Sequence, residues 1–211
     1  MLRKFIFFDL GNVLLRFSVD VMLGRGSAVL GCSADELYRV IYEDGWGCRL
    51  EMGLVTEREF FDTVCGKFGA DLDFVQLAEA FNDIFVEMDF IYPFLENLSS
   101  SGFPRGILSN TSSGHWNHVI SKYSYLTKWI PENHVLSFRV GAMKPDKAIF
   151  EYAMNTAQKA VGKNVNLNAG DILFIDDLKQ NIEGAANFGF DTIQFTDWQY
   201  VEKELKKRSL K

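Results

Sequence analysis

Four short polar clusters lie where predicted strands end, and their residue types could do chemistry together. They are Asp9-Leu-Gly-Asn12, Ser109-Asn-Thr111, Lys144-Pro145 and Asp176-Asp177. Taken singly, a polar cluster after a strand is usually an ordinary turn or a helix cap. The adjacent aspartates are the hardest to explain in that way, because two like charges at a buried edge repel each other unless a cation compensates them.

The acidic clusters could together attack a phosphorus atom. A carboxylate such as Asp9 can act as a nucleophile toward phosphorus, although its charge repels a phosphate dianion. A divalent cation held by Asp9 and the Asp176–Asp177 pair would remove that repulsion and polarise the phosphoryl group. Magnesium (Mg²⁺) prefers a few carboxylates with water and substrate oxygens, and this set supplies them.

The remaining clusters supply groups that bind phosphoryl oxygens. The Lys144 ammonium can neutralise residual negative charge, and the Ser109 hydroxyl can donate a hydrogen bond. Nearby backbone amides can also donate to phosphoryl oxygens, and we expect this of Leu10, Gly11 and Asn110. The expected partner is therefore a small-molecule phosphate ester.

The elements that must position these clusters alternate between strands and helices. Short, continuously apolar runs predict strands at Lys4–Phe8, Gly106–Leu108, Val135–Phe138, Ile172–Ile175 and Thr192–Phe195. Helical patterns lie between them, including 91–101, 146–161 and 181–188. This alternation predicts an α/β fold, a parallel sheet flanked by helices, in which the carboxyl ends of the strands form the ligand crevice.

The stretch from residue 17 to residue 88 differs, because it contains no convincing strand. Ser33 with Glu36, and Thr56 with Glu59, fit the capping box that starts a helix. Apolar residues then recur at spacings of three and four from 60 to 68 and from 74 to 88. We therefore expect a helical subdomain at 17–88, with a core of its own that holds many of the 19 phenylalanines, inserted into an α/β core of residues 1–16 and 89–211.

Composition disfavours other classes of protein. The formal net charge is −6 and the sequence pI is about 5.1, whereas a nucleic-acid binder needs clustered Lys and Arg. The basic stretch 203–211 is interleaved with Glu202 and Glu204, as in a solvated terminal helix. We expect no membrane span, no signal peptide and a cytoplasmic location, with Cys32, Cys48 and Cys65 as reduced thiols.

In this order, the four clusters resemble the four signature motifs of the haloacid dehalogenase (HAD) superfamily. The first motif is an apolar strand that ends in the nucleophilic aspartate, here Asp9, and the second ends in Ser109 within Ile107-Leu-Ser-Asn110. The third motif is a lysine, here Lys144. The fourth is an acidic pair, here Asp176-Asp177, and the resemblance spans essentially the whole chain.

The resemblance implies a Rossmann-like core with a helical cap inserted after the first strand. Its Asp-Leu-Gly-Asn-Val-Leu variant is similar to bacterial sugar-phosphate phosphatases such as glucose-1-phosphatase, and to the phosphatase half of soluble epoxide hydrolase. It therefore implies a magnesium-dependent phosphatase that hydrolyses a small phosphate monoester, such as a sugar phosphate, through an aspartyl-phosphate. In that interpretation Asp9, Ser109, Lys144 and Asp176 are catalytic, and Asp9, the Gly11 carbonyl and Asp177 bind the metal.

One position departs from the pattern of the phosphatases in this superfamily. They usually carry a second aspartate two residues after the nucleophile, which protonates the leaving alcohol and then activates water, and here that position is Gly11. Loss of a general acid costs about 10²–10⁴-fold in rate. A water molecule, a residue of the cap, or His115 could substitute. Dehalogenating members place a tyrosine at this position, so halide release is disfavoured.

Three alternatives follow from these residues. A phosphosugar mutase is disfavoured by Gly11, because a mutase must protonate and deprotonate sugar hydroxyls. A non-catalytic phosphate sensor or partner-binding protein is favoured by the missing acid and disfavoured by the intact nucleophile, lysine and acidic pair. A transition-metal site at His115 and His118 is disfavoured because no further ligand is near in sequence, and we expect loop or surface histidines.

Overall fold

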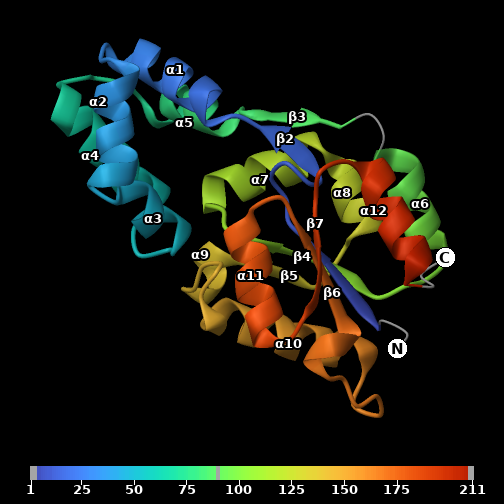
Figure 1. Cartoon of the computed structure of the whole chain (residues 1–211). Helices are drawn as coiled ribbons and strands as arrows, with labels where there is room; N and C mark the ends of the chain where they lie inside the picture. The colour runs from blue at the N-terminus through green and yellow to red at the C-terminus, as the bar shows by residue number, and fades with distance from the viewer. Residues whose placement is uncertain (1–3, 89–90, 209–211) are drawn as a thin grey trace.

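A central parallel sheet organises the chain, whose computed structural model describes residues 4–88 and 91–208. Its strand order is β5-β4-β1-β6-β7, and every neighbouring pair in it is parallel (Figure 1). The strands are β1 (Phe5–Phe8), β4 (Arg105–Ser109), β5 (His134–Leu136), β6 (Ile172–Asp176) and β7 (Asp191–Gln194). The predicted α/β fold is confirmed, and β1, which carries the first polar cluster, is its central strand.

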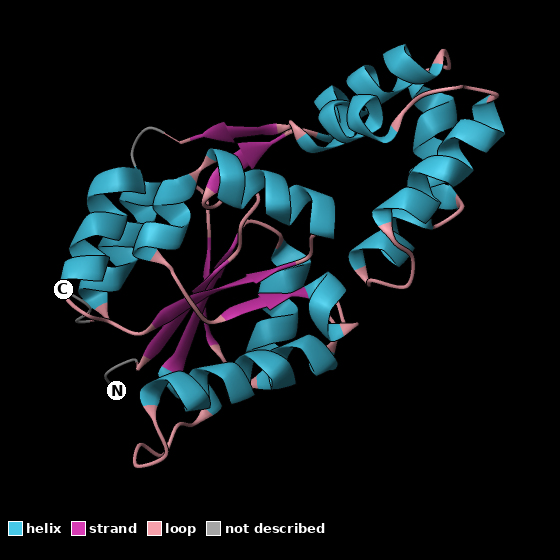
Figure 2. Cartoon of the chain, turned by 180° about the vertical axis from the view of Figure 1, so that it is seen from behind, coloured by secondary structure: helices cyan, strands magenta, loops and turns pink. Residues whose placement is uncertain are grey.

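Helices cover both faces of the sheet (Figure 2). Alternate side chains of β1 point to opposite faces, so Ile6 and Phe8 join one apolar cluster while Phe5 and Phe7 join the other. The first face packs against α6 (Ile91–Ser100), α7 (Ser113–Lys122), α8 (Ser124–Trp129) and α12 (Trp198–Lys207). The second packs against α10 (Lys147–Val161) and α11 (Lys179–Phe188). Burial on both faces explains why β1 is continuously apolar.

A group of helices between β2 and β3, here called the helical insert, lies to one side of the sheet (Figure 1). Both predicted capping boxes are present, at Ser33 and at Thr56, and a third joins Asp73 and Gln76. The insert consists of α1 (Val19–Leu30), α2 (Ala34–Tyr38), the π-helical turn η1 (Arg39–Glu43), α3 (Trp46–Glu51), α4 (Glu57–Phe68) and α5 (Phe74–Asn82).

The insert joins the core through a two-stranded antiparallel ribbon, which corrects the prediction of no strand in 17–88. Strands β2 (Leu15–Phe17) and β3 (Phe85–Glu87) pair, with the Phe17 and Phe85 rings 6.1 Å apart. The helical spacing of apolar residues continues through residue 88, but α5 ends at Asn82. Ile84 and Phe85 fit a helical or a strand period equally well, and only pairing with β2 decides between them.

The sheet, rather than the insert, divides the apolar residues into two clusters. Met22, Leu37 and Phe61 of the insert belong to the same cluster as Ile6 and Phe8. The expectation of a separate core inside the insert is therefore wrong, because the side chains of the connecting ribbon and of segment 10–15 make the packing continuous.

Two smaller features complete the frame. The predicted strand 135–138 ends at Leu136, where the four-residue helix α9 (Ser137–Val140) begins, and a 3₁₀ turn, η2 (Ala169–Asp171), leads into β6. Among the described residues, no helix has the length and hydropathy that a membrane crossing requires.

Candidate active site

The strand order brings the four polar clusters to one edge of the sheet. Asp9 directly follows β1, Ser109 ends β4 and Asp176 ends β6, and both β4 and β6 pair with β1. Lys144 lies in the loop before α10. Residues more than 160 positions apart therefore share one site, as expected for carboxyl ends of parallel strands.

Lys144 contacts several groups of this site and is only 4% exposed. Its Nζ lies 2.8 Å from Asp9 Oδ1 and 2.7 Å from Asp176 Oδ2, and it donates a hydrogen bond to the Leu108 carbonyl at 3.0 Å. Since a lysine ammonium has three N–H donors, this geometry uses all of them. Lys144 thus connects the nucleophile candidate to the acidic pair.

The Asn110 side chain holds the backbone of Lys144. Its Nδ2 donates to the Lys144 carbonyl at 2.9 Å, and its Oδ1 accepts from the Lys144 amide at 2.8 Å. The Lys144–Pro145 peptide bond in this loop is cis. The sequence predicts that the backbone amide of Asn110 binds phosphate. In the structure, the side chain of Asn110 positions the backbone of Lys144.

Asp9 is buried, with 8% of its surface exposed. Burial raises the pKa of Asp9 to about 7, the Asp176 charge raises it too, and Lys144 opposes both. Burial lowers the pKa of Lys144, but the charges of Asp9 and Asp176 outweigh this effect. The net result is a pKa raised above its usual value, so the ammonium stays charged. The Leu10 amide donates to Asp9 Oδ1 at 2.7 Å and so orients the carboxylate.

Asp176 is fully buried, and its carboxylate accepts hydrogen bonds from two other groups besides Lys144. The Leu178 amide donates to Oδ1 at 2.8 Å, and Asn181 Nδ2 lies 3.1 Å from each oxygen. Sequence reasoning did not assign a role to Asn181. Its position in the first turn of α11, five residues after Asp176, is the signal that indicates it.

The acidic group is arranged as a candidate metal site. Oxygen atoms of Asp9, Asp176 and Asp177 all lie within 4.8 Å of one another. Asp177 is half-buried, and both burial and the neighbouring Asp176 charge raise its pKa, while a hydrogen bond from Asn12 lowers it. Three carboxylates beside one ammonium leave excess negative charge, and hard oxygen donors of this kind suit a small divalent cation.

Gly11 occupies the position of the missing acid, and there is no free space for a side chain there. A Cβ built at Gly11 would lie 2.7 Å from a ring carbon of Phe17. Phe17 ends β2 and packs against Phe85 across the ribbon. An aspartate at position 11 would therefore have to displace an aromatic ring.

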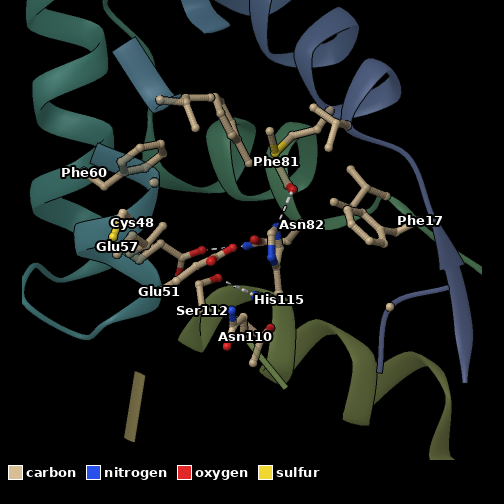
Figure 3. Close-up of a pocket in the computed structure, with 18 of the residues that line it drawn as sticks. Phe17, Cys48, Glu51, Glu57, Phe60, Phe81, Asn82, Asn110, Ser112 and His115 are labelled. Carbon is tan, nitrogen blue, oxygen red and sulfur yellow. Dashed lines mark hydrogen bonds between the residues drawn. The ribbon is translucent and has the colours of Figure 1, made fainter. Parts of the chain in front are cut away.

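A cavity of about 320 Å³ opens beside these residues, lined by both the core and the helical insert. Figure 3 shows Phe60 and Phe81 on the side of the insert and Asn110 and Ser112 on the side of the core. Most of its wall is apolar, including Phe17, Met22, Ile41, Phe60, Phe81 and Phe85. Gly11 and Ser109 also line the cavity, so it reaches the predicted phosphoryl site.

Two polar side chains of this wall differ from expectation. His115, expected in a loop or at the surface, lies in α7 and is half-buried, and its Nε2–H donates to the Phe81 carbonyl at 3.1 Å. Desolvation lowers the pKa of His115 to about 4, so the ring is neutral near pH 7. Glu51, at the end of α3, was not assigned from the sequence, and burial raises its pKa to about 7.

The chain is similar in sequence to a known protein. The chain is 24% identical over 213 residues to drimenol cyclase DrtB of Aspergillus calidoustus, a match that covers 97% of this chain and 36% of that protein. The chain therefore spans about a third of the length of this relative.

Two solved structures share the fold. A HAD family enzyme of Bacteroides thetaiotaomicron, in complex with magnesium and inorganic phosphate, is 24% identical with a TM-score of 0.77, covering 94% of this chain and 98% of that one. A predicted HAD-like family hydrolase of Porphyromonas gingivalis is 21% identical with a TM-score of 0.78, covering 98% and 99%.

The family itself is shown by a match over most of the chain. The model of the haloacid dehalogenase-like hydrolases matches residues 4–189, which include all four polar clusters. The order of these clusters, their convergence at one sheet edge and this match agree, and the chain belongs to the haloacid dehalogenase-like hydrolases.

Proposed function

We propose that this hydrolase is a magnesium-dependent phosphatase that cleaves a small phosphate monoester through an aspartyl-phosphate on Asp9. The observation that carries the proposal is the Asp9 carboxylate, held by Lys144 and Leu10 within a group of three carboxylates, next to a cavity that Leu10 and Gly11 line. The fold is shared with a HAD family enzyme that was solved with magnesium and inorganic phosphate, which supports the same ligands here.

Magnesium fits the donor set of this chain. Asp9 and Asp177, which lie in the carboxylate cluster, would hold the ion together with the Gly11 carbonyl, and each of these groups offers a hard oxygen atom. When bound, it supplies charge neutralisation between the carboxylates and the phosphate dianion, and it polarises the phosphoryl group.

Residues of the chain itself have distinct roles in the proposed reaction. The Asp9 carboxylate attacks phosphorus, forming an oxygen–phosphorus bond as the bond to the leaving oxygen breaks. Lys144 stabilises the charge on the phosphoryl group, while Asp176 and Asn110 fix the position of Lys144. The buried Ser109 hydroxyl lies in the cavity wall, where it can donate to a phosphoryl oxygen.

The helical insert is proposed to act as a cap over this site. The chain then divides into a core of residues 1–16 and 89–211 and a cap of residues 17–88. The cavity is lined from both parts, and the β2–β3 ribbon is the connection through which the cap could move. A cap of this kind would exclude water and select the organic group of the ester.

The cavity wall bears on the identity of that organic group. Sugar hydroxyls need hydrogen-bond partners, whereas much of this wall is aromatic or aliphatic. We therefore place an alkyl or aryl group against Phe60, Phe81 and Phe85, with the phosphoryl group at Asp9. The sugar phosphate expected from the family resemblance stays a prediction.

Phosphate release from a panel of esters tests the proposed function. The panel contains glucose 1-phosphate, phenyl phosphate and a series of alkyl phosphates, each with magnesium and with a chelator. We expect release that requires magnesium and a kcat/KM that rises with the apolar area of the ester. A kcat/KM that is highest for glucose 1-phosphate would instead support the sugar phosphate.

The same panel separates the alternatives. A phosphate sensor would bind inorganic phosphate but release none from any ester. A phosphosugar mutase would convert one sugar phosphate into its isomer without net release. Either outcome would overturn the proposed hydrolysis.

A further inference from the structure

The proposed reaction needs a proton for the leaving oxygen, and the usual donor is absent. At Gly11 the space for an acidic side chain is taken by the Phe17 ring. An alkoxide is a poor leaving group, so an acid in reach of the ester oxygen accelerates its departure. A protein side chain that supplies this proton would therefore have to come from another part of the cavity wall.

We propose that Glu51, on α3 of the helical insert, gives this proton to the leaving oxygen and later takes one from the attacking water. The proposal rests on the phosphatase function above and names a catalytic residue for it. Figure 3 shows Glu51 extending from the insert into the cavity, towards Asn110 and Ser112 of the core.

The end of α3 is held against the loop that carries the catalytic lysine. Cys48 Sγ lies 3.8 Å from Met143 Sδ, and Met143 directly precedes Lys144. Gly53 has a positive φ of 68°, and a Cβ there would clash with the Phe138 carbonyl oxygen, so the two backbones are in close contact. Glu51 thus lines the same cavity as Gly11 and Ser109, and the charge of Lys144 lowers its pKa.

The surroundings of Glu51 suit a group that both gives and takes a proton. Burial raises its pKa to about 7, with Lys144 opposing, so both protonation states are populated near neutral pH. The neighbouring Tyr42 is a much weaker acid, because burial and the Glu51 charge raise its pKa to about 12.

The other candidate donors of the cavity wall are engaged elsewhere. Glu57 accepts a hydrogen bond from Asn82 Nδ2 at 2.6 Å. His115 gives its Nε2–H to the Phe81 carbonyl and is neutral at pH 7. Among the described residues, none forms a hydrogen bond or an ion pair with the Glu51 carboxyl group, which leaves it available to substrate.

The proton balance closes over one turnover. In the first step Asp9 bonds to phosphorus, the ester bond breaks with its electron pair on the leaving oxygen, and the Glu51 proton converts that oxygen to an alcohol. In the second step the Glu51 carboxylate takes a proton from water as the water oxygen attacks phosphorus. The bond to Asp9 then breaks, which restores the Asp9 carboxylate, releases inorganic phosphate and leaves Glu51 protonated.

The test compares esters whose leaving groups differ in their need for a proton. The 4-nitrophenolate anion leaves without one, whereas an alkoxide does not. We expect Glu51→Gln to lower kcat/KM about 10²-fold or more for an alkyl phosphate and less than about tenfold for 4-nitrophenyl phosphate. The quantity kcat/KM is the right one, because it reports the steps up to departure of the alcohol.

Two variants control for structural effects. Glu57→Gln changes the same residue type in the same cavity, and we expect it to alter kcat/KM by the same factor for both esters. Glu51→Asp keeps an acid and should recover part of the activity on the alkyl ester. Thermal melting of each variant checks that it is folded.

An equal loss on both esters with Glu51→Gln, or no loss on either, would overturn the role of Glu51 while leaving the phosphatase function intact. Absence of phosphate release by the unmodified protein from every ester would overturn the phosphatase function, and the proton role with it.

Discussion

At the residue scale, Gly11 of the core and Glu51 of the insert line the same cavity and are complementary in chemistry. Gly11 lacks an acid, and Phe17 fills the space that one would need. Glu51 offers an acid from the insert, with a pKa that burial raises to about 7. In the proposed mechanism, the general acid therefore comes from the helical insert instead of from the end of β1.

Restoring an aspartate at position 11 should therefore fail by itself. Gly11→Asp forces the Phe17 ring away from Phe85, and we expect a loss of about 1–3 kcal/mol in the free energy of unfolding. Thermal melting and kcat/KM for an alkyl phosphate measure the outcome.

The double variant Gly11→Asp with Phe17→Ala makes room for the new carboxyl group. It should act faster on the alkyl ester than Phe17→Ala alone. A gain in activity from Gly11→Asp without loss of stability would contradict the steric argument.

The pH dependence of Glu51 has a definite sign. A raised pKa of about 7 means that the carboxyl group is protonated below that pH and loses its proton above it. Since the leaving oxygen needs the protonated form, kcat/KM of the unmodified protein divided by that of Glu51→Gln, for an alkyl phosphate, should fall as pH rises through about 7. Dividing the two values cancels the titration of the substrate phosphate, and the expected midpoint of the fall is a pH of ~7. A ratio that does not change between about pH 5 and pH 9 would contradict the assignment.

The sequence indicated the candidate residues that are local to strand ends, whereas it did not indicate those whose position depends on packing. Asp9 follows an apolar strand, and Ser109 and Asp176 each end one, so their common edge could be inferred. Glu51 is remote from every motif, and only docking of α3 on the core brings it to the cavity. Asn181 was missed because its contact with Asp176 requires the first turn of α11.

At the scale of elements, the contact between α3 and the loops of the core sets the position of Glu51. Gly53 permits that contact through its positive φ and its lack of a side chain facing the Phe138 carbonyl. The position of α3 could not be predicted from its own sequence, because the partner surface comes from residues about 85 positions later.

Gly53→Ala should hold the end of α3 away from the core. We expect about tenfold or greater loss in kcat/KM for an alkyl phosphate and a smaller loss for 4-nitrophenyl phosphate, because the proton donor is displaced while Asp9 is not. Gly31→Ala is the matched control, since Gly31 also has a positive φ, of 68°, but a Cβ there meets no atom within 4 Å. Equal effects of the two substitutions would show that backbone strain, rather than docking, is responsible.

Helices and strands were predicted correctly where the apolar spacing fits only one of the two. The prediction was wrong where the spacing fits both a helix and a strand. The five strands of the sheet are short apolar runs between helical patterns, and all five lie within two residues of their predicted ends. The segment 84–87 is apolar at spacings that suit a helix or a strand, and its pairing with β2 at Phe17 was decided by tertiary contact.

At the scale of the whole molecule, the acidic net charge is compatible with a phosphate ligand because part of it is gathered at the sheet edge. Asp9, Asp176 and Asp177 converge there around Lys144. The overall charge of −6 excludes neither a phosphate ester nor the cation that would accompany it. The strand order around β1 is what makes this convergence possible.

The central claim is that Asp9 forms a covalent bond to phosphorus. Rapid acid quench during turnover of an alkyl phosphate, followed by mass spectrometry of the peptide that contains residue 9, measures it directly. We expect the mass of one phosphoryl group on Asp9, and we expect Asp9→Asn to lose this adduct together with turnover, by roughly 10³-fold or more. The exposed Asp35→Asn serves as the control and should keep both. Unchanged turnover in Asp9→Asn, or a phosphoryl group on another residue, would contradict the account.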